Sequence, residues 1–155
     1  GDFYAAEAFI DESIDACYSA APPRADISRF GSRRLDKMLK DMDKSFAETL
    51  FHYIDKKGLT DVEAYKRSNV GKKTFSKIKC NPKTYKPSKQ TAIALALALE
   101  LDLENTRDLI GRAGYALTNS STFDLIIRYF IEHKQFNVIE INIALYEFDQ
   151  SLLGA

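Results

Sequence analysis

The residues of this chain that could do chemistry are mostly lysines, and they gather in one stretch. Residues 65–99 contain no Asp or Glu. The bases in this stretch are Lys66, Arg67, Lys72, Lys73, Lys77, Lys79, Lys83, Lys86 and Lys89. The whole sequence has 22 bases and 22 acids, so the block is a local feature of a neutral chain. Such a block predicts a surface that attracts a polyanion, and the alternative is a solvated face that serves solubility.

No arrangement of residues predicts catalysis. His52 and His133 belong to different predicted helices and have no Cys, Asp or Glu at metal-ligand spacing. Cys17 and Cys80 lie far apart and form no CxxC motif, which predicts no disulfide framework and favours a reducing compartment. We therefore expect a protein that is not an enzyme and that uses no metal or cofactor.

The composition favours a single folded domain with an appendage. The chain has 155 residues, of which 45% are hydrophobic and 12% aromatic, and this is enough to build a core. Its longest apolar run, residues 91–99, is too short to cross a bilayer. The first residues lack the basic start and apolar core of a signal peptide. We expect no membrane partner and a cytoplasmic location.

Residues 59–79, LTDVEAYKRSNVGKKTFSKIK, predict two short helices joined by a tight turn. Thr60 and Glu63 have the spacing of a capping box at the start of the first helix. Asn69 can adopt the left-handed backbone that the turn needs, Val70 would be its apolar plug, and Gly71 would open the second helix. The inward side chains of the second helix would be Thr74, Phe75 and Ile78. Its outward side chains would be Lys72, Lys73, Ser76, Lys77 and Lys79.

This stretch resembles the helix-turn-helix of the λ-repressor-like (XRE) family, whose pattern is roughly L-T-Q-E-E-L-A-x-x-x-G-V-S-x-x-T-I-S-x-I. The matching residues are Leu59, Thr60, Glu63, Val70, Thr74, Ser76 and Ile78, and Phe75 replaces an aliphatic residue. The resemblance implies a five-helix core whose second motif helix enters the major groove of DNA. The residues expected near base edges are Lys72, Lys73, Thr74 and Ser76. The residues expected near phosphates are Lys77, Lys83 and Lys86, and Lys79 belongs to the same surface.

Apolar residues recur with helical spacing along the rest of the chain, so the sequence predicts an all-α fold. Further helices are expected over residues 3–20, 33–44, 45–58 and 89–101, and after the capping residues Asp102, Ser121 and Asn137. Residues 89–101 are apolar on almost every side, which predicts a helix buried in the core. We expect residues 1–44 to form an N-terminal helical extension, residues 45–117 the helix-turn-helix core, and residues 118–155 a C-terminal helical pair packed on that core.

Two of these helices carry specific predictions about which side chains face inward. The inward residues of the helix over residues 33–44 would be Leu35, Met38, Leu39 and Met42. Those of the helix after Asn137 would be Val138, Ile141, Leu145 and Phe148. Between the helices, residues 80–88 are expected to form a loop. Its Tyr85 would either contact the nucleic-acid backbone or anchor the loop on the domain.

Several phrases spread over most of the chain carry a second resemblance. They are SFAETLFHYID, TDVEAYKRSNV, FSKIKCNP, KPSKQTAIALALALEL, RAGYALTNSSTFDLIIRYFI and EINIALYEFDQSLL. Residues 35–153 resemble a helical module found at the C-terminus of bacterial proteins, behind macro domains or von Willebrand A-type domains. The resemblance implies an accessory module attached to an effector or ligand-sensing domain, with no activity of its own established.

Two functions are consistent with these patterns. The first is a regulatory module that binds duplex DNA through the lysine-rich helix. The second is a protein-interaction module that keeps the helix-turn-helix fold without binding DNA, and Asp61 and Tyr65 favour it because they depart from the family pattern. The last two predicted helices carry many large apolar residues, which predicts packing on the core or self-association. Self-association through the N-terminal helix is a further alternative.

Overall fold

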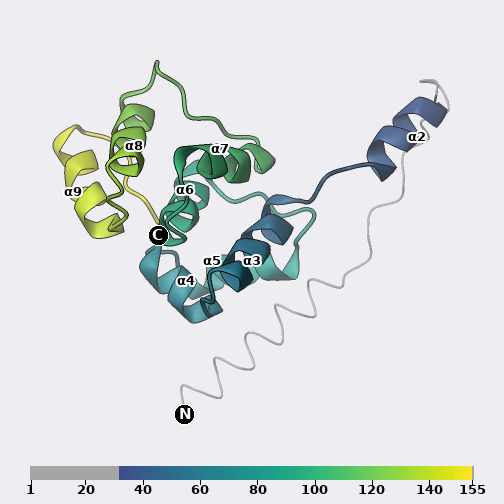
Figure 1. The fold of residues 1–155 in the computed structure, drawn as a ribbon, viewed down its shortest axis with the longest axis horizontal. Coiled ribbons are helices and arrows are strands. Elements are labelled where there is room, and N and C mark those ends of the chain that lie inside the picture. The colour runs from purple at the N-terminus through teal and green to yellow at the C-terminus, as the bar shows by residue number, and fades with distance from the viewer. Residues whose placement is uncertain (1–31, 155) are drawn as a thin grey trace, which may run out of the picture. The chain divides into compact units, whose positions relative to one another are not determined.

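The computed structural model describes residues 32–154, and in this range the chain forms helices and no strands (Figure 1). The prediction of an all-α fold is therefore confirmed for the described residues. The chain divides into two compact units, residues 1–44 and residues 45–155. The helix predicted over residues 3–20, the loop that follows it and Cys17 lie outside the described residues.

The described part of the first unit is the helix α2 (Ser32–Lys40) and the residues up to 44. The helix ends before the predicted residue 44. The apolar side chains of α2 are largely exposed: Met38 is 72% exposed, and Met42, just beyond the helix, is 70% exposed. The prediction that Met38, Leu39 and Met42 turn inward is wrong, since residues 32–44 contain no second helix to cover them.

The second unit is built around a buried central helix. Its helices are α3 (Phe46–Lys56), α4 (Asp61–Arg67), α5 (Lys72–Cys80), α6 (Lys89–Ala98), α7 (Leu103–Arg112), α8 (Thr122–Glu132) and α9 (Val138–Glu147). Helix α6 contacts α4, α7 and α9, and α3 packs against α7 (Figure 1). All residues from Thr91 to Leu99 are buried, so the prediction of a helix buried in the core is confirmed.

Six of these seven helices begin with a side chain that caps the backbone. The capping residues are Ser45, Thr60, Ser88, Asp102, Ser121 and Asn137. Each oxygen accepts a hydrogen bond from a backbone N–H two or three residues further on, which satisfies a donor that the helix itself leaves unpaired. Helix α5 is the exception, because its capping position is Gly71, which has no side chain.

The same six helices end in a left-handed residue that closes a Schellman motif. These residues are Gly58, Asn69, Glu100, Gly114, Lys134 and Asp149. At the end of α6, for example, Glu100 N–H donates to the Leu97 carbonyl at 2.9 Å and Leu101 N–H donates to the Ala96 carbonyl at 3.3 Å. This reversal ends α6 before the predicted residue 101. Helix α5 again differs, because the residue after its end, Asn81, has φ −122° and no left-handed residue follows.

A buried ion pair joins the beginning of α8 to the beginning of α6. The Asp124 side chain is 1% exposed, and Lys89 Nζ lies 2.7 Å from its Oδ1. The Thr118 backbone N–H and hydroxyl donate to its Oδ2 at 2.9 and 3.2 Å. Lys89 therefore serves the core and is not part of the exposed basic block in which the sequence placed it.

The C-terminal segment folds back over α9 to the turn between α4 and α5. Leu153 is buried, and the Asn142 side chain holds its backbone, accepting from its N–H at 2.7 Å and donating to its carbonyl at 3.2 Å. Gly154 lies against Asn69 so closely that a Cβ would fall 2.3 Å from the Asn69 carbonyl oxygen. The prediction that Phe148 faces inward is wrong: it is 59% exposed, because the chain reverses at the next residue.

Candidate nucleic-acid interface

The turn between α4 and α5 has the local features that the sequence predicts. The Thr60 hydroxyl accepts a hydrogen bond from Glu63 N–H at 3.2 Å. Asn69 adopts the left-handed conformation with φ 59°, Val70 is buried, and Gly71 precedes the first residue of α5. These contacts fix the direction in which α5 leaves the turn.

The inward face of α5 is held by aromatic packing. Phe75 and Ile78 are buried, as predicted, and Thr74 is half-buried. The Phe75 ring lies 5.6 Å from the ring of Tyr65 and 5.7 Å from the ring of Phe51, measured between centroids. Tyr65 is thus accommodated beside Phe75, and these contacts set which side of α5 faces the solvent.

The outward face of α5 presents lysines. Lys72, Lys73 and Lys77 are exposed, and Ser76 is half-buried. Lys72 and Lys77 form no ion pair with any residue between 32 and 154. Their ammonium groups are therefore open to an anionic ligand.

Lys79 has a partner on the neighbouring helix. Its Nζ lies 2.7 Å from the Asp61 Oδ2 at the beginning of α4. Both side chains are partly exposed, so the pair adds little to stability. Its electrostatic consequence is larger, because Lys79 neutralises the acid at the beginning of α4 and is itself less available to a ligand.

The loop after α5 is tied down at both ends. The Ser45 hydroxyl donates to the Pro82 carbonyl, and the Tyr115 hydroxyl donates to the Pro87 carbonyl at 2.8 Å. Tyr85 is half-buried against the core, which supports the interpretation of Tyr85 as a loop anchor.

The two predicted lysines of this loop differ in their surroundings. Lys86 Nζ lies 5.0 Å from the centre of the Tyr115 ring, a cation–π contact that holds its charge against the domain. Lys83 is exposed and has no ion-pair partner in the described part of the chain. Of the two loop lysines, Lys83 is therefore the one whose charge is more available to a ligand.

The remaining reactive side chains lie apart from one another. His133 stacks on Tyr129 with the ring centres 4.1 Å apart, His52 is exposed on α3, and Cys80 is half-buried at the end of α5. Residues 32–154 contain no group of three His, Cys, Asp or Glu side chains that could hold a metal ion. Burial raises the pKa of Tyr53, and Asp108 and Asp102 raise it further, so this phenol stays protonated at neutral pH.

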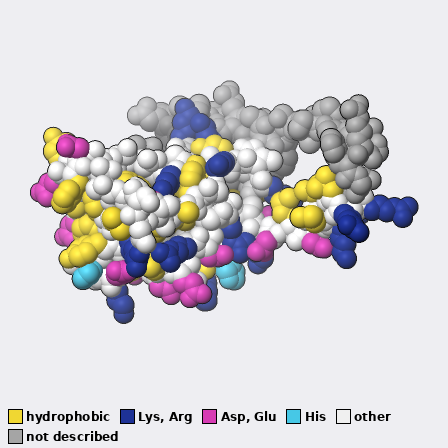
Figure 2. All heavy atoms as spheres, turned by 90° about the horizontal axis from the view of Figure 1, so that it is seen from above, with side chains coloured by type: hydrophobic (Ala, Val, Ile, Leu, Met, Phe, Trp, Pro, Cys, Tyr) yellow, Lys and Arg dark blue, Asp and Glu magenta, His cyan; other side chains and the backbone are white. Residues whose placement is uncertain are grey.

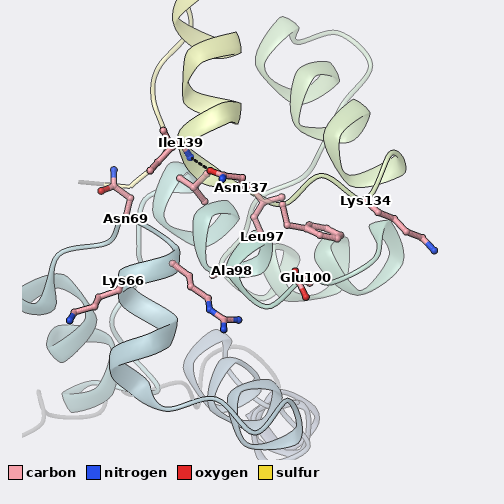
Figure 3. Close-up of a pocket in the computed structure, with 11 residues that line it drawn as sticks. Lys66, Asn69, Leu97, Ala98, Glu100, Lys134, Asn137 and Ile139 are labelled. Carbon is pink, nitrogen blue, oxygen red and sulfur yellow. Dashed lines mark hydrogen bonds between the residues drawn. The ribbon is translucent and has the colours of Figure 1, made fainter.

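A groove of about 650 Å³ lies between the end of α4 and the beginning of α9 (Figure 3). Its lining includes Lys66, Lys134, Glu100 and Asn137. Figure 3 shows Lys66 and Lys134 extending away from each other, and Asn137 accepting the hydrogen bond from Ile139 N–H at 3.0 Å. The charged groups do not converge on one point, so the groove is a weaker candidate for an anion site than α5.

No protein-family model, curated protein or solved structure matches the chain. Among the described helices, none is both long and apolar enough to span a bilayer.

Proposed function

We propose that this chain is an accessory module that binds duplex DNA, with α4 and α5 acting as a helix-turn-helix of the λ-repressor-like type. The observation that carries the proposal is the division of α5 into two faces. Phe75 and Ile78 are buried, whereas Lys72 and Lys77 are exposed without ion-pair partners in the described part of the chain. The apolar side of such a helix is held against the core, so its lysine-rich side can face a phosphate backbone.

In this mode the first turn of α5 enters the major groove. Lys72, Lys73, Thr74 and Ser76 would lie near base edges, and Lys77 and Lys83 near phosphates. Because Gly71 has no capping side chain, the first N–H groups of α5 can also donate to a phosphate. Lys79 and Lys86, held by Asp61 and Tyr115, would contribute less than the sequence suggests.

The proposed binding would be mainly electrostatic. Helix α5 contains no arginine, and a lysine is a point charge without the two-pronged geometry that recognises guanine best. If about four phosphates are neutralised, the logarithm of the association constant falls with the logarithm of salt concentration at a slope of about −3.6. The second resemblance supports a role as the accessory part of a larger bacterial effector, which would supply added specificity.

The test is fluorescence anisotropy with a labelled random duplex across a salt series. The variant Lys72→Glu/Lys77→Glu reverses two exposed charges of α5. The matched control Lys56→Glu/Lys57→Glu makes the same change in net charge at the end of α3. We expect the α5 variant to lose at least about tenfold in affinity, since phosphate contacts dominate binding to a random sequence. The control should bind more like the native protein.

Two results would overturn the proposal. One is the absence of duplex binding at low salt. The other is an equal loss of affinity in the α5 variant and in the control, which would show that only the net charge matters.

A second candidate function is favoured by the pairing of Lys79 with Asp61. In the λ-repressor-like pattern the position of Asp61 normally carries a glutamine, and an acid there is unsuited to a phosphate. The helix-turn-helix would then be retained as a regulatory module that binds an acidic protein through the same lysines. Binding of polyglutamate, in the absence of duplex binding, would identify this function.

A further inference from the structure

The exposed face of α9 is apolar to an unusual degree for a surface helix. Ile139, Ile143 and Tyr146 follow at spacings of four and three residues, and they are 70%, 57% and 75% exposed. Phe148 and Leu152 continue the apolar surface beyond the end of the helix. In Figure 2, hydrophobic and acidic side chains gather at the left of the view, on the side of the second unit where α8 and α9 lie in Figure 1. Exposed apolar surface of this kind is typical of an interaction site.

The charged side chains of α9 itself and of the segment that follows it are all acidic. Residues 135–155 contain Glu140, Glu147 and Asp149 and no Lys or Arg. All three acids are exposed, and Glu140 and Glu147 are seven residues apart on α9, beside the apolar stripe. An apolar stripe bordered by acids is complementary to a helix with one apolar side and basic flanks.

We propose that the exposed face of α9 binds an amphipathic helix of another protein that is rich in lysine or arginine. The side chains of Ile139, Ile143 and Tyr146 would meet the apolar side of the partner, and Glu140 and Glu147 its bases. A second copy of this chain fits less well, because symmetric pairing of α9 would bring the same acids together. The binding surface contains no residue of α5, so it does not depend on the proposed DNA binding.

The two ends of α9 differ in charge, and this difference favours one orientation of the partner. Lys66, Arg67 and Lys134 line the groove at the beginning of α9. Glu147 and Asp149 lie at the other end of the helix. The bases of the partner are therefore expected to be most numerous toward the end of α9, next to Tyr146 and Phe148, where two acids lie close together.

The experiment uses the full chain and two labelled helical peptides. Both have the same leucines along one side, and the polar positions are lysine in one peptide and glutamate in the other. Fluorescence anisotropy at physiological salt should show at least about tenfold tighter binding of the lysine peptide, because like charges oppose the glutamate peptide. The variant Ile143→Glu/Tyr146→Glu should lose at least about tenfold in affinity for the lysine peptide, since it removes the centre of the apolar stripe. Val62→Glu, at another exposed apolar position, is the control and should bind like the native protein.

A charge exchange gives an independent test that does not alter the apolar stripe. Glu140→Lys/Glu147→Lys should shift the preference from the lysine peptide toward the glutamate peptide. Equal binding of both peptides to the native protein, or unchanged preference in this variant, would overturn the proposal. So would a concentration-dependent dimer, detected by sedimentation velocity, that Ile143→Glu/Tyr146→Glu abolishes, because a second copy would then cover the face.

Discussion

Helices α5 and α6 are consecutive and almost equal in length, with nine and ten residues, but they are stabilised in different ways. Helix α6 is buried from Thr91 to Ala98, whereas α5 buries only Phe75 and Ile78. Helix α6 has a capping serine and a Schellman end, and α5 has neither. A nine-residue helix without an N-terminal capping side chain or a Schellman end is unstable alone, so α5 depends on its tertiary contacts. The comparison separates a helix that holds the domain together from a helix whose outward side chains are available for binding.

The largest expected difference is in the free energy of unfolding, between an alanine substitution in α6 and one in α5. Leu95→Ala in α6 should lower the free energy of unfolding by about 3 kcal/mol, because a fully buried leucine leaves a cavity. Lys77→Ala in α5 should change it by less than about 0.5 kcal/mol, since the side chain is exposed. Urea denaturation followed by circular dichroism measures both values. Equal effects of the two substitutions would contradict the comparison.

The next largest effect concerns the ion pair at the beginning of α6. Lys89→Met should lower the free energy of unfolding by about 2 kcal/mol, because it leaves the buried Asp124 carboxylate without its counter-charge. The double variant Lys89→Met/Asp124→Leu should recover part of this loss, since it removes both charges. If Lys89→Met leaves the unfolding curve unchanged, the pair is not a structural element.

The helix caps should give smaller effects. Ser88→Ala should lower the free energy of unfolding by about 1 kcal/mol, because it removes the acceptor for Thr91 N–H at 3.2 Å. The same urea titration measures the loss of stability. The control is Thr122→Ala, which changes the first residue of α8 and leaves the capping residue of that helix, Ser121, in place. A loss of stability in the control equal to that of Ser88→Ala would argue against a capping effect.

The smallest effect on the free energy of unfolding is expected at the beginning of α5, where Gly71 offers no capping side chain. Gly71 has the extended backbone of a capping residue, with φ −64° and ψ 143°, and no atom within 4 Å of an added Cβ. Gly71→Ser should therefore raise the free energy of unfolding by about 0.5 kcal/mol. The same variant should weaken duplex binding, because the new hydroxyl would compete with a phosphate for the first N–H groups of α5. Stabilisation without weaker binding would show that these N–H groups do not contact DNA.

Helix beginnings were the features that the sequence predicted best, because a cap involves residues only two or three positions apart. Thr60, Asp102, Ser121 and Asn137 all cap the helices expected to follow them. The ends were harder to predict. Glu100, Lys134 and Asp149 adopt left-handed conformations that favour glycine, and their side chains gave no signal for this.

Contacts between distant residues could not be predicted from local patterns. Lys79 and Asp61 are on different helices, and their pairing depends on how α4 and α5 pack against each other. Asp124 has the spacing of a solvent-exposed capping partner, yet it is buried because Lys89 and Thr118 meet it from two other segments. The sequence correctly predicted that the lysines of α5 are exposed. Which of these lysines form ion pairs, and are therefore less available to a ligand, could be seen only in the structure.

The position of Gly154 against Asn69 has a practical consequence for binding experiments. An affinity tag or fluorescent protein fused at the C-terminal end would begin close to the turn that leads into α5. Such a fusion would crowd the surface whose affinity is being measured, and a weaker signal could be misread as an intrinsic property of the module.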